Sequence, residues 1–521
     1  MKPVNENQSR KPARKLQQGL AALVSMLSII GIVLLSEGIL RAMDGQPLTQ
    51  AELGRSAPRK PPPIRPLVSL ATTLTTDPQL KPAWIDEPPP PISTKGHPDL
   101  ALETIDAGQR SNWLREQGRY RQYNARWLRH WGCKRQSHID SLPQPVLVFD
   151  APRSDSHPAF RYLQSYETPT GFITNRFGWR GPNLPLDKPS DTIRIAFVGA
   201  STTVGQPDFE FSYPEFVVHW LNLWAADQKL DLRFDGINAG RAGISSASIA
   251  AIVETEVLPM EPDLVLYYEG SNQFSLASLL DVPVEVRTVF HKVETPKWRQ
   301  RLVAAERYSI LVGKLRQSLD RLMSDGGAEP EKPDYQLRWP DGLDEFSPQL
   351  DHPKLPVNLS AILIDLEKIR LAVEDGGADF ALGSFVWLAY EGLRVDPVRQ
   401  SWFLHFFNTR YWPYRYTDIR RLADFQNRVL QAFARTNELL FLKVAEAYPQ
   451  QPDLFIDGIH FSSDGTRLQA WIVLQNLLPQ IRERLDAGDW PRPDQTRLRA
   501  HPAIGTPRPI SKPCENLGQA W

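Results

Sequence analysis

The chain has little cysteine, with only Cys133 and Cys514 among its 521 residues. It lacks a Cys-x-x-Cys motif, and its cysteines and histidines do not cluster at the spacing of zinc ligands. A thiol enzyme and a structural zinc site are therefore disfavoured. Because Cys514 lies in a tail that we expect to be unstructured, two free thiols are favoured over a disulfide.

An excess of charge of one sign is also missing. Lysine and arginine total 60 residues, and aspartate and glutamate total 60 as well. The sequence has no dense basic stripe interleaved with aromatic residues, so we expect no nucleic-acid partner. Proline, in contrast, is abundant at 46 residues and clusters at both ends of the chain. Such clusters are typical of extended linkers, which places the globular core between them.

The segment 19–40 has the character of a transmembrane anchor. Residues 19–36 carry no charge, and about 20 apolar residues suffice to cross the hydrocarbon of a bilayer. Basic residues are concentrated before the segment, whereas Arg41 stands alone after it. This asymmetry predicts a single-pass protein with a cytoplasmic N-terminus and an extracytoplasmic main domain, either periplasmic or extracellular.

Two other interpretations of this segment are weaker. A cleaved signal peptide has an apolar core of about 7 to 15 residues and a small-x-small cleavage site. The core here is longer, and no Ala-x-Ala follows it. A buried helix of a soluble protein would not require the flanking charge bias.

Composition divides the chain into one domain with flanking linkers. A basic tail occupies 1–18. After the anchor we expect a proline-rich spacer, a helical and turn-rich extension, an α/β domain, and a disordered tail, at 41–97, 98–189, 190–488 and 489–521. An insertion at 275–359 interrupts the α/β domain and is expected to contain helix and a long loop over the site.

Two parts of the extension carry more specific signals. Aromatic spacing predicts a packed helix at 98–132. The turn-rich segment 175–182 predicts a β-hairpin that closes one edge of the sheet, with a ligand-binding role for Arg180 as the alternative.

Apolar runs and helical periodicity alternate through the main domain. The first half predicts a strand at 193–198, a helix at 213–229, a strand ending near Asn238, a helix at 245–258 and a strand at 264–268. The second half predicts a helix at 360–374, a strand at 379–387, a helix at 418–436, a strand at 439–444 and a helix at 463–485. This alternation indicates an α/β fold with a parallel sheet and right-handed crossovers.

A serine directly follows the first of these strands. Ligands bind at the carboxyl ends of parallel strands, which makes Ser201 a candidate nucleophile. An ordinary strand-to-helix turn with a capping hydroxyl is the alternative. A serine nucleophile needs an oriented base, and His460 is the one histidine with an aspartate, Asp457, three residues before it. The alternative interpretation is an ordinary loop in which Asp457 caps a turn and His460 faces solvent.

Two further turns offer hydrogen-bond donors for an oxyanion. Gly243 can supply a backbone N–H at the start of a helix, and Asn272 a side-chain N–H after the third strand. Glycine and asparagine are also the most common turn residues, so either residue alone is weak evidence for an oxyanion donor. The order and position of all these residues make the set specific.

In this order, the chain resembles the SGNH hydrolases, also called the GDSL family, over residues 190–275 and 360–486. The Gly-Asp-Ser motif of the family matches Gly199-Ala200-Ser201, and the glycine in the family name matches Gly243. The family motif Gly-x-Asn-Asp matches Gly270-Ser271-Asn272-Gln273, and its Asp-x-x-His motif matches Asp457 and His460. The resemblance implies a three-layer α/β/α sandwich of flavodoxin-like type. Ala200 and Gln273 depart from the family pattern, and neither position carries a proton transfer.

The expected function is a serine esterase without metal or cofactor. It would act through an acyl-enzyme on acetyl or other acyl esters of envelope glycans or lipids. One alternative is an O-acetyltransferase that modifies an exported polysaccharide. The other is a catalytically silent protein that keeps the fold and binds a ligand.

Overall fold

The structure is a computed structural model, and the ranges it describes are, apart from scattered single positions, 34–40, 67–92, 149–150, 161–162, 172–207, 209–276, 327–396, 403–404 and 406–492. The chain forms two compact units. The first comprises 1–59, 291–328 and 396–401, and in it Glu37 accepts hydrogen bonds from the Ser309 hydroxyl and the Leu311 N–H. The second unit contains all the candidate site residues.

Several sequence predictions fall outside the described ranges. These are the packed helix at 98–132, both cysteines, most of the anchor at 19–40, most of the tail at 489–521 and most of the charged stretch in the insertion. Across the ranges that are described, no helix is both long enough and apolar enough to cross a membrane. The anchor therefore stays a prediction.

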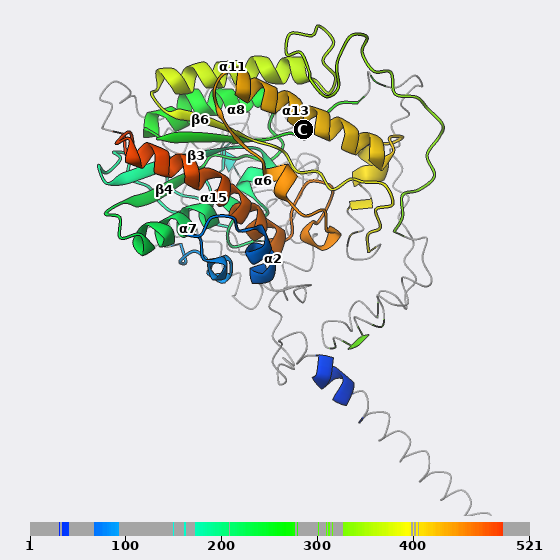
Figure 1. Cartoon of the computed structure of the whole chain (residues 1–521), viewed down its shortest axis with the longest axis horizontal. Helices are drawn as coiled ribbons and strands as arrows, with labels where there is room; N and C mark the ends of the chain where they lie inside the picture. Colours follow the sequence, from blue (N-terminus) through cyan, green and yellow to red (C-terminus); the bar gives the residue numbers. More distant parts are fainter. Residues whose placement is uncertain are drawn as a thin grey trace, which may run out of the picture. The chain divides into compact units, whose positions relative to one another are not determined.

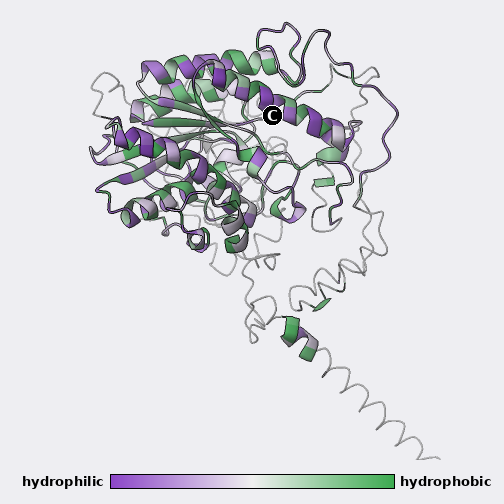
Figure 2. Cartoon of the chain, viewed as in Figure 1, coloured by the Kyte–Doolittle hydropathy of each residue, from purple (hydrophilic) through white to green (hydrophobic). Residues whose placement is uncertain are grey.

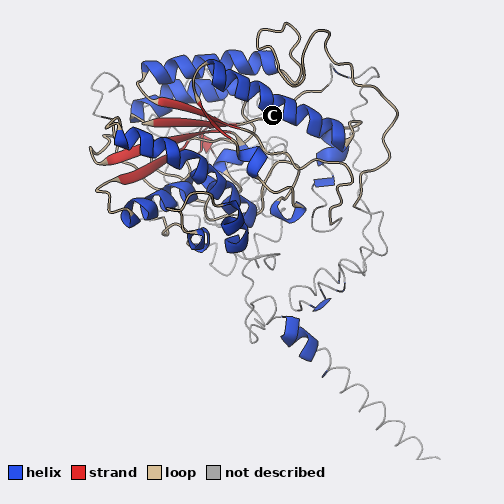
Figure 3. Ribbon diagram, in the orientation of Figure 1, coloured by secondary structure: helices blue, strands red, loops and turns tan. Residues whose placement is uncertain are grey.

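A parallel sheet of five strands forms the centre of the second unit (Figure 3). The strands are β3 (Thr192–Gly199), β4 (Arg233–Asn238), β5 (Leu264–Tyr268), β6 (Asp379–Gly383) and β7 (Leu440–Leu442). Their spatial order is β4-β3-β5-β6-β7, with every neighbouring pair parallel. This is the flavodoxin-like order. The direction in which successive strands are added reverses between β3 and β5, and ligands bind at this point in such sheets.

Burial explains why β3 and β5 are central strands. Every residue of both strands is buried, as expected for strands covered on both faces by helices. The edge strands β4 and β7 contain partly exposed positions. In Figure 2 the strands are mostly hydrophobic, while the helices α7, α13 and α15 carry both hydrophobic and hydrophilic residues.

Helices cover both faces of the sheet, which gives the three layers that the sequence predicts (Figure 1). The helices on one face are α2 (Leu67–Leu74), α7 (Tyr213–Asp227) and α15 (Ser463–Asp486). Those on the other are α8 (Ser246–Ile252), α11 (Leu359–Asp375) and α13 (Tyr416–Thr436). Between α15 and α7, the rings of Trp471 and Trp220 pack edge to face, with centroids 5.4 Å apart.

Shorter elements complete the described part of the chain. They are η2 (Pro82–Asp86), β1 (Phe149–Asp150), β2 (Arg161–Tyr162), α6 (Ser201–Val204), η3 (Val253–Val257), η4 (Leu258–Met260), η6 (Phe406–Arg410), α14 (Val444–Ala447) and η7 (Pro452–Leu454). Bridges from Arg180 to Thr174 and to Asn238 of β4 confirm the predicted hairpin at the sheet edge.

The proline-rich region at 41–97 is not a spacer throughout, which corrects the sequence prediction. Residues 67–74 form α2, and Ala71 and Ile85 are fully buried within the second unit. Arg482 of α15 also pairs with Asp77, at 2.6 Å. The physical reason is that Leu67, Leu70, Ala71 and Leu74 lie at helical spacing and form one short apolar face.

Three element boundaries also differ from prediction. The strand predicted at 379–387 ends at Gly383, because its partner β7 is only three residues long, and 384–389 continue without regular pairing. The predicted strand 439–444 is shorter, as β7, because α14 begins at Val444. The predicted helix 245–258 changes to π and then to 3-10 geometry after Ile252.

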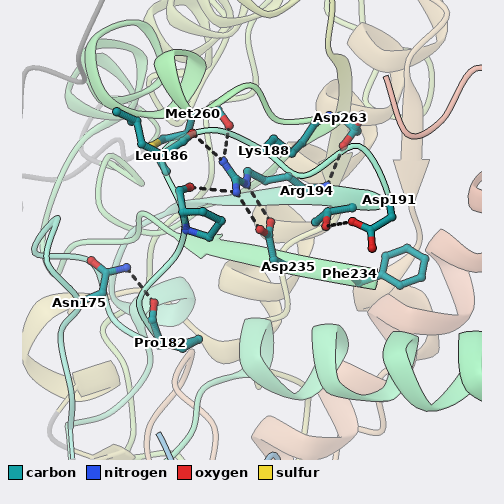
Figure 4. Close-up of polar contacts among 12 residues, drawn as sticks. Asn175, Pro182, Leu186, Lys188, Asp191, Arg194, Phe234, Asp235, Met260 and Asp263 are labelled. Carbon is teal, nitrogen blue, oxygen red and sulfur yellow. Dashed lines mark hydrogen bonds and ion pairs between the residues drawn. The ribbon is translucent and has the colours of Figure 1, made fainter. Parts of the chain in front are cut away.

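A buried arginine fixes the N-terminal edge of the sheet (Figure 4). Arg194 of β3 is fully buried and makes a two-pronged ion pair with Asp235 of β4, at 2.9 and 2.8 Å. Its guanidinium also donates to the carbonyls of Met260 and Pro185, and its backbone N–H donates to Asp263. The charge is thus compensated, as a buried charge requires. This network lies at the edge of the sheet away from the candidate site.

Candidate active site

Ser201 begins α6 directly after β3, at the carboxyl edge of the sheet. Gly199 permits this sharp turn, because a Cβ there would lie 2.2 Å from Thr203 Oγ1 and 2.3 Å from the Tyr268 carbonyl oxygen. Thr203 Oγ1 in turn donates to that carbonyl, at 3.1 Å, which joins the turn to the end of β5. The Ser201 hydroxyl is thereby held over the switch point between β3 and β5.

His460 and Asp457 lie beside this serine although 259 positions separate His460 from Ser201. His460 Nε2 is 2.8 Å from Ser201 Oγ, and His460 Nδ1 is 2.7 Å from Asp457 Oδ2. When Nδ1 carries its proton and donates to the carboxylate, Nε2 can accept the serine proton. The Asp457 side chain is 3% exposed, whereas the His460 ring is 17% exposed and accessible to a substrate.

Asp457 also shapes the loop that carries the histidine. Its Oδ1 accepts the backbone N–H groups of Ile459 and His460, at 2.9 and 2.8 Å. The Ile456 N–H donates to the His460 carbonyl, at 2.9 Å, and closes the turn. The loop rests on Phe407, since a Cβ on Gly458 would come within 2.1 Å of that ring. The imidazole therefore has little freedom to leave its position.

The electrostatics of this pair favour charge on both partners. Burial alone would lower the pKa of His460, but the nearby Asp457 carboxylate outweighs it and raises that pKa above its ordinary value of 6.5. Glu269 acts in the same direction and Arg410 in the opposite one. For Asp457, burial opposes ionisation, but His460 and the two backbone N–H groups bring its pKa below the ordinary 3.8. Asp457 is thus a carboxylate at neutral pH.

The turns that contain Gly243 and Asn272 meet at the same edge of the sheet. Asn272 Nδ2 donates to the carbonyl of Ile244, at 2.9 Å, which ties the two turns together. Gly243 has a positive φ of 74° and sits at the tip of its turn, where glycine is favoured. An amide nitrogen has two protons, so Asn272 keeps one for another acceptor. The arrangement brings both candidate donors into one neighbourhood, and their oxyanion role stays a prediction.

The turn before Gly243 is fixed by a buried ion pair. Arg241 and Glu256 are each 1% exposed, and their side chains pair directly. Trp179 Nε1 also donates to this carboxylate, at 3.2 Å. The backbone N–H of Arg241 also donates to the Gly199 carbonyl. The turn is therefore anchored both to the serine turn and to the helical layer.

The two departures from the family pattern occupy structurally satisfied positions. Ala200 is fully buried beneath the serine turn. Gln273 Oε1 accepts the N–H of Ser246 at the start of α8, at 2.6 Å. Its backbone carbonyl accepts from Asn358 Nδ2, at 2.7 Å. Gln273 thus supports the loop after β5 without a charge.

Arg180 supports the serine turn from below. Its guanidinium is buried and donates to three carbonyls at the end of α6 and in the segment that follows, those of Val204, Gln206 and Phe209. With its donors used in this way, the arginine is an internal brace, which disfavours the ligand-binding alternative.

Sequence reasoning missed a different charged residue, Glu269, which directly precedes Gly270. The available signal was an acidic residue at the end of an apolar strand.

Comparison with known proteins yields similarity in structure alone. No known family profile and no curated protein matches this chain. Among solved structures, it is similar to the acetylxylan esterase Axe2 of Geobacillus stearothermophilus, with 17% identity and a TM-score of 0.30 over 56% of this chain and 96% of that one. A GDSL-like lipase of Bacteroides thetaiotaomicron is 12% identical, with a TM-score of 0.27 over 56% of this chain and 88% of that one. A lipase/acylhydrolase of Enterococcus faecalis is 16% identical, with a TM-score of 0.29 over 55% of this chain and 96% of that one. Similarity at this level assigns neither a family nor an activity.

Proposed function

We propose that this chain is a serine esterase that cleaves acyl esters through a covalent acyl-enzyme. The observation that carries the proposal is the continuous relay of hydrogen bonds from Ser201 Oγ to His460 and from His460 to Asp457. A nucleophile, a base and an orienting carboxylate in this geometry are the requirements of acyl transfer by serine. The burial of both partners also fits this role, since the Asp457 carboxylate is buried and the His460 imidazole is partly exposed.

The reaction proceeds in two halves. In the first, His460 Nε2 takes the Ser201 proton while Oγ attacks the ester carbonyl, and the oxyanion forms near Gly243 and Asn272. The protonated imidazole then gives its proton to the leaving alcohol as the C–O bond breaks. In the second half, His460 takes a proton from water, the resulting hydroxide attacks the acyl-enzyme, and the proton returns to Ser201 as the acid leaves.

The proposed substrates are acetyl or similar acyl esters carried by glycans or lipids of the cell envelope. This part of the proposal rests on the predicted anchor at 19–40, which would hold the second unit outside the cytoplasm. The esters that fit this location are those on exported glycans and on lipids. The relay itself acts on the ester carbonyl whatever alcohol carries it.

Labelling with a fluorophosphonate tests the proposed nucleophile. The reagent reacts with serines that an adjacent base activates, so purified protein should be modified on one peptide containing Ser201. Replacing Ser201 by alanine should abolish labelling, and replacing the exposed Ser69 of α2 by alanine should leave it intact. Mass spectrometry of the digested protein locates the adduct. An adduct on another residue, or undiminished labelling of the Ser201→Ala protein, contradicts the proposal.

Replacement of Asn272 by alanine should lower kcat for p-nitrophenyl acetate by about 10²- to 10³-fold, because one oxyanion donor is lost. KM should change little, because this donor acts mainly on the transition state. The matched control is Asn437→Ala, which likewise removes an Nδ2 donor to a backbone carbonyl but lies next to the N-terminal end of β7, away from the site. A kcat within threefold of the parent value would exclude Asn272 as an oxyanion donor.

A further inference from the structure

Glu269 is a buried carboxylate at the carboxyl end of β5, beside the turn that carries Asn272. It follows Tyr268, the last residue of that strand, and it is 5% exposed. A buried acidic side chain is costly unless its oxygens are hydrogen-bonded. None of the proposed catalytic steps uses this group, so its presence needs another explanation.

One oxygen of Glu269 holds the turn that carries the oxyanion asparagine. Oε1 accepts the backbone N–H groups of Ser271 and Asn272, at 2.8 and 2.7 Å. These two bonds fix the direction in which the chain leaves β5. They therefore fix the position from which the Asn272 side chain reaches the carbonyl of Ile244. The side-chain amide of Asn272 is thus held from both ends.

The other oxygen of Glu269 is left without a hydrogen bond from any described residue, although it is buried. Burial raises the pKa of Glu269, and the N–H groups of the turn together with His460 counteract that effect only in part. The groups whose charges bear on His460 are Asp457 in its own loop, Glu269 at the end of β5 and Arg410 of η6. From another element, His460 lowers the pKa of Glu269. Glu269 in turn raises the pKa of Tyr411, which follows η6.

We propose that Glu269 is a positioning residue. Its Oε1 sets the oxyanion turn, and in its ionised form the carboxylate stabilises the imidazolium that His460 becomes during the reaction. The inference rests on the proposed esterase function. It assigns the two effects to separable properties of one side chain. The acceptor oxygen acts on Asn272, and the charge acts on His460.

Two substitutions separate these properties. Glu269→Gln keeps an amide oxygen as acceptor for both N–H groups but removes the charge. Glu269→Ala removes both. With p-nitrophenyl acetate, the alanine variant should lose about 10²-fold in kcat, because the oxyanion donor is no longer held in place. The glutamine variant should recover most of that loss, and the acid limb of its kcat/KM profile should shift to lower pH, because His460 loses a stabilising charge.

The sign of that shift follows from the direction of the interaction. Glu269 raises the pKa of His460, and the reaction needs the neutral imidazole as base. Without the charge, His460 stays neutral to lower pH. A matched control is Glu254→Gln, an exposed carboxylate of η3, which changes the net charge equally and should leave the profile unchanged. Circular dichroism and thermal melting establish that all the variants are folded.

Parallel assay of Ser201→Ala distinguishes failure of the inference from failure of the proposed function. If Ser201→Ala is inactive while Glu269→Gln has the parent pH profile, the charge of Glu269 does not act on His460. If Ser201→Ala is inactive while folded Glu269→Ala keeps the parent kcat, Glu269 does not set the oxyanion turn. Either result overturns the positioning role. Activity that persists in Ser201→Ala overturns the esterase proposal itself.

Discussion

Replacement of Ser201 by alanine should lower kcat for an acyl ester by about 10⁶-fold, to a level set by the oxyanion donors and binding alone. The change removes the atom that forms the acyl-enzyme, so the two-step route is lost and direct attack by water is left. Because Ser201 lies on a turn whose backbone contacts do not involve the hydroxyl, the fold should persist. Stopped assays with p-nitrophenyl acetate over several hours provide the needed sensitivity.

The control for this prediction is Ser69→Ala, an exposed hydroxyl in α2 of the same unit. It should keep the parent kcat and KM, so any loss common to both variants would reflect preparation rather than chemistry. A folded Ser201→Ala protein with more than a hundredth of the parent kcat would show that turnover does not pass through this serine.

The parallel sheet could be predicted from the sequence because its strands are short apolar runs separated by amphipathic helices. The strand predicted at 264–268 coincides with β5, and the strand predicted at 193–198 lies within β3. The proximity of Ser201 and His460 follows from the same topology, since the carboxyl ends of parallel strands meet at one edge of the sheet. No local pattern was needed to bring them together.

Other features depend on contacts that local patterns do not encode. The docking of 67–92 onto α7 and α15 depends on helices that are distant in sequence, and the prolines around it give only the signal of a linker. The end of β6 at Gly383 is set by the length of β7, a neighbour distant in sequence. Glu269 was missed because an acidic residue after a strand is usually solvated.

Replacement of Asp457 by asparagine should lower kcat on the order of 10⁴-fold. The amide is close in shape to the carboxylate, but it can offer an N–H to His460 Nδ1 and so favour the tautomer that places the proton on Nε2. That tautomer cannot accept the Ser201 proton. The exposed Asp453, in η7 of the same loop region, provides the matched Asp453→Asn control, which should retain the parent kcat.

The pH profile of these proteins gives an independent test of the same pair. In the parent protein kcat/KM should fall as the pH drops through the His460 pKa, and that pKa lies above 6.5 because of Asp457. In Asp457→Asn the stabilising charge is gone, so the residual activity should persist to lower pH. Burial of His460 then acts against the charged form with less opposition. If the acid limb of the residual activity coincides with that of the parent protein, Asp457 does not set the charge state of His460. If the kcat of Asp457→Asn lies within tenfold of the parent value, Asp457 does not act in the hydrogen-bonded relay.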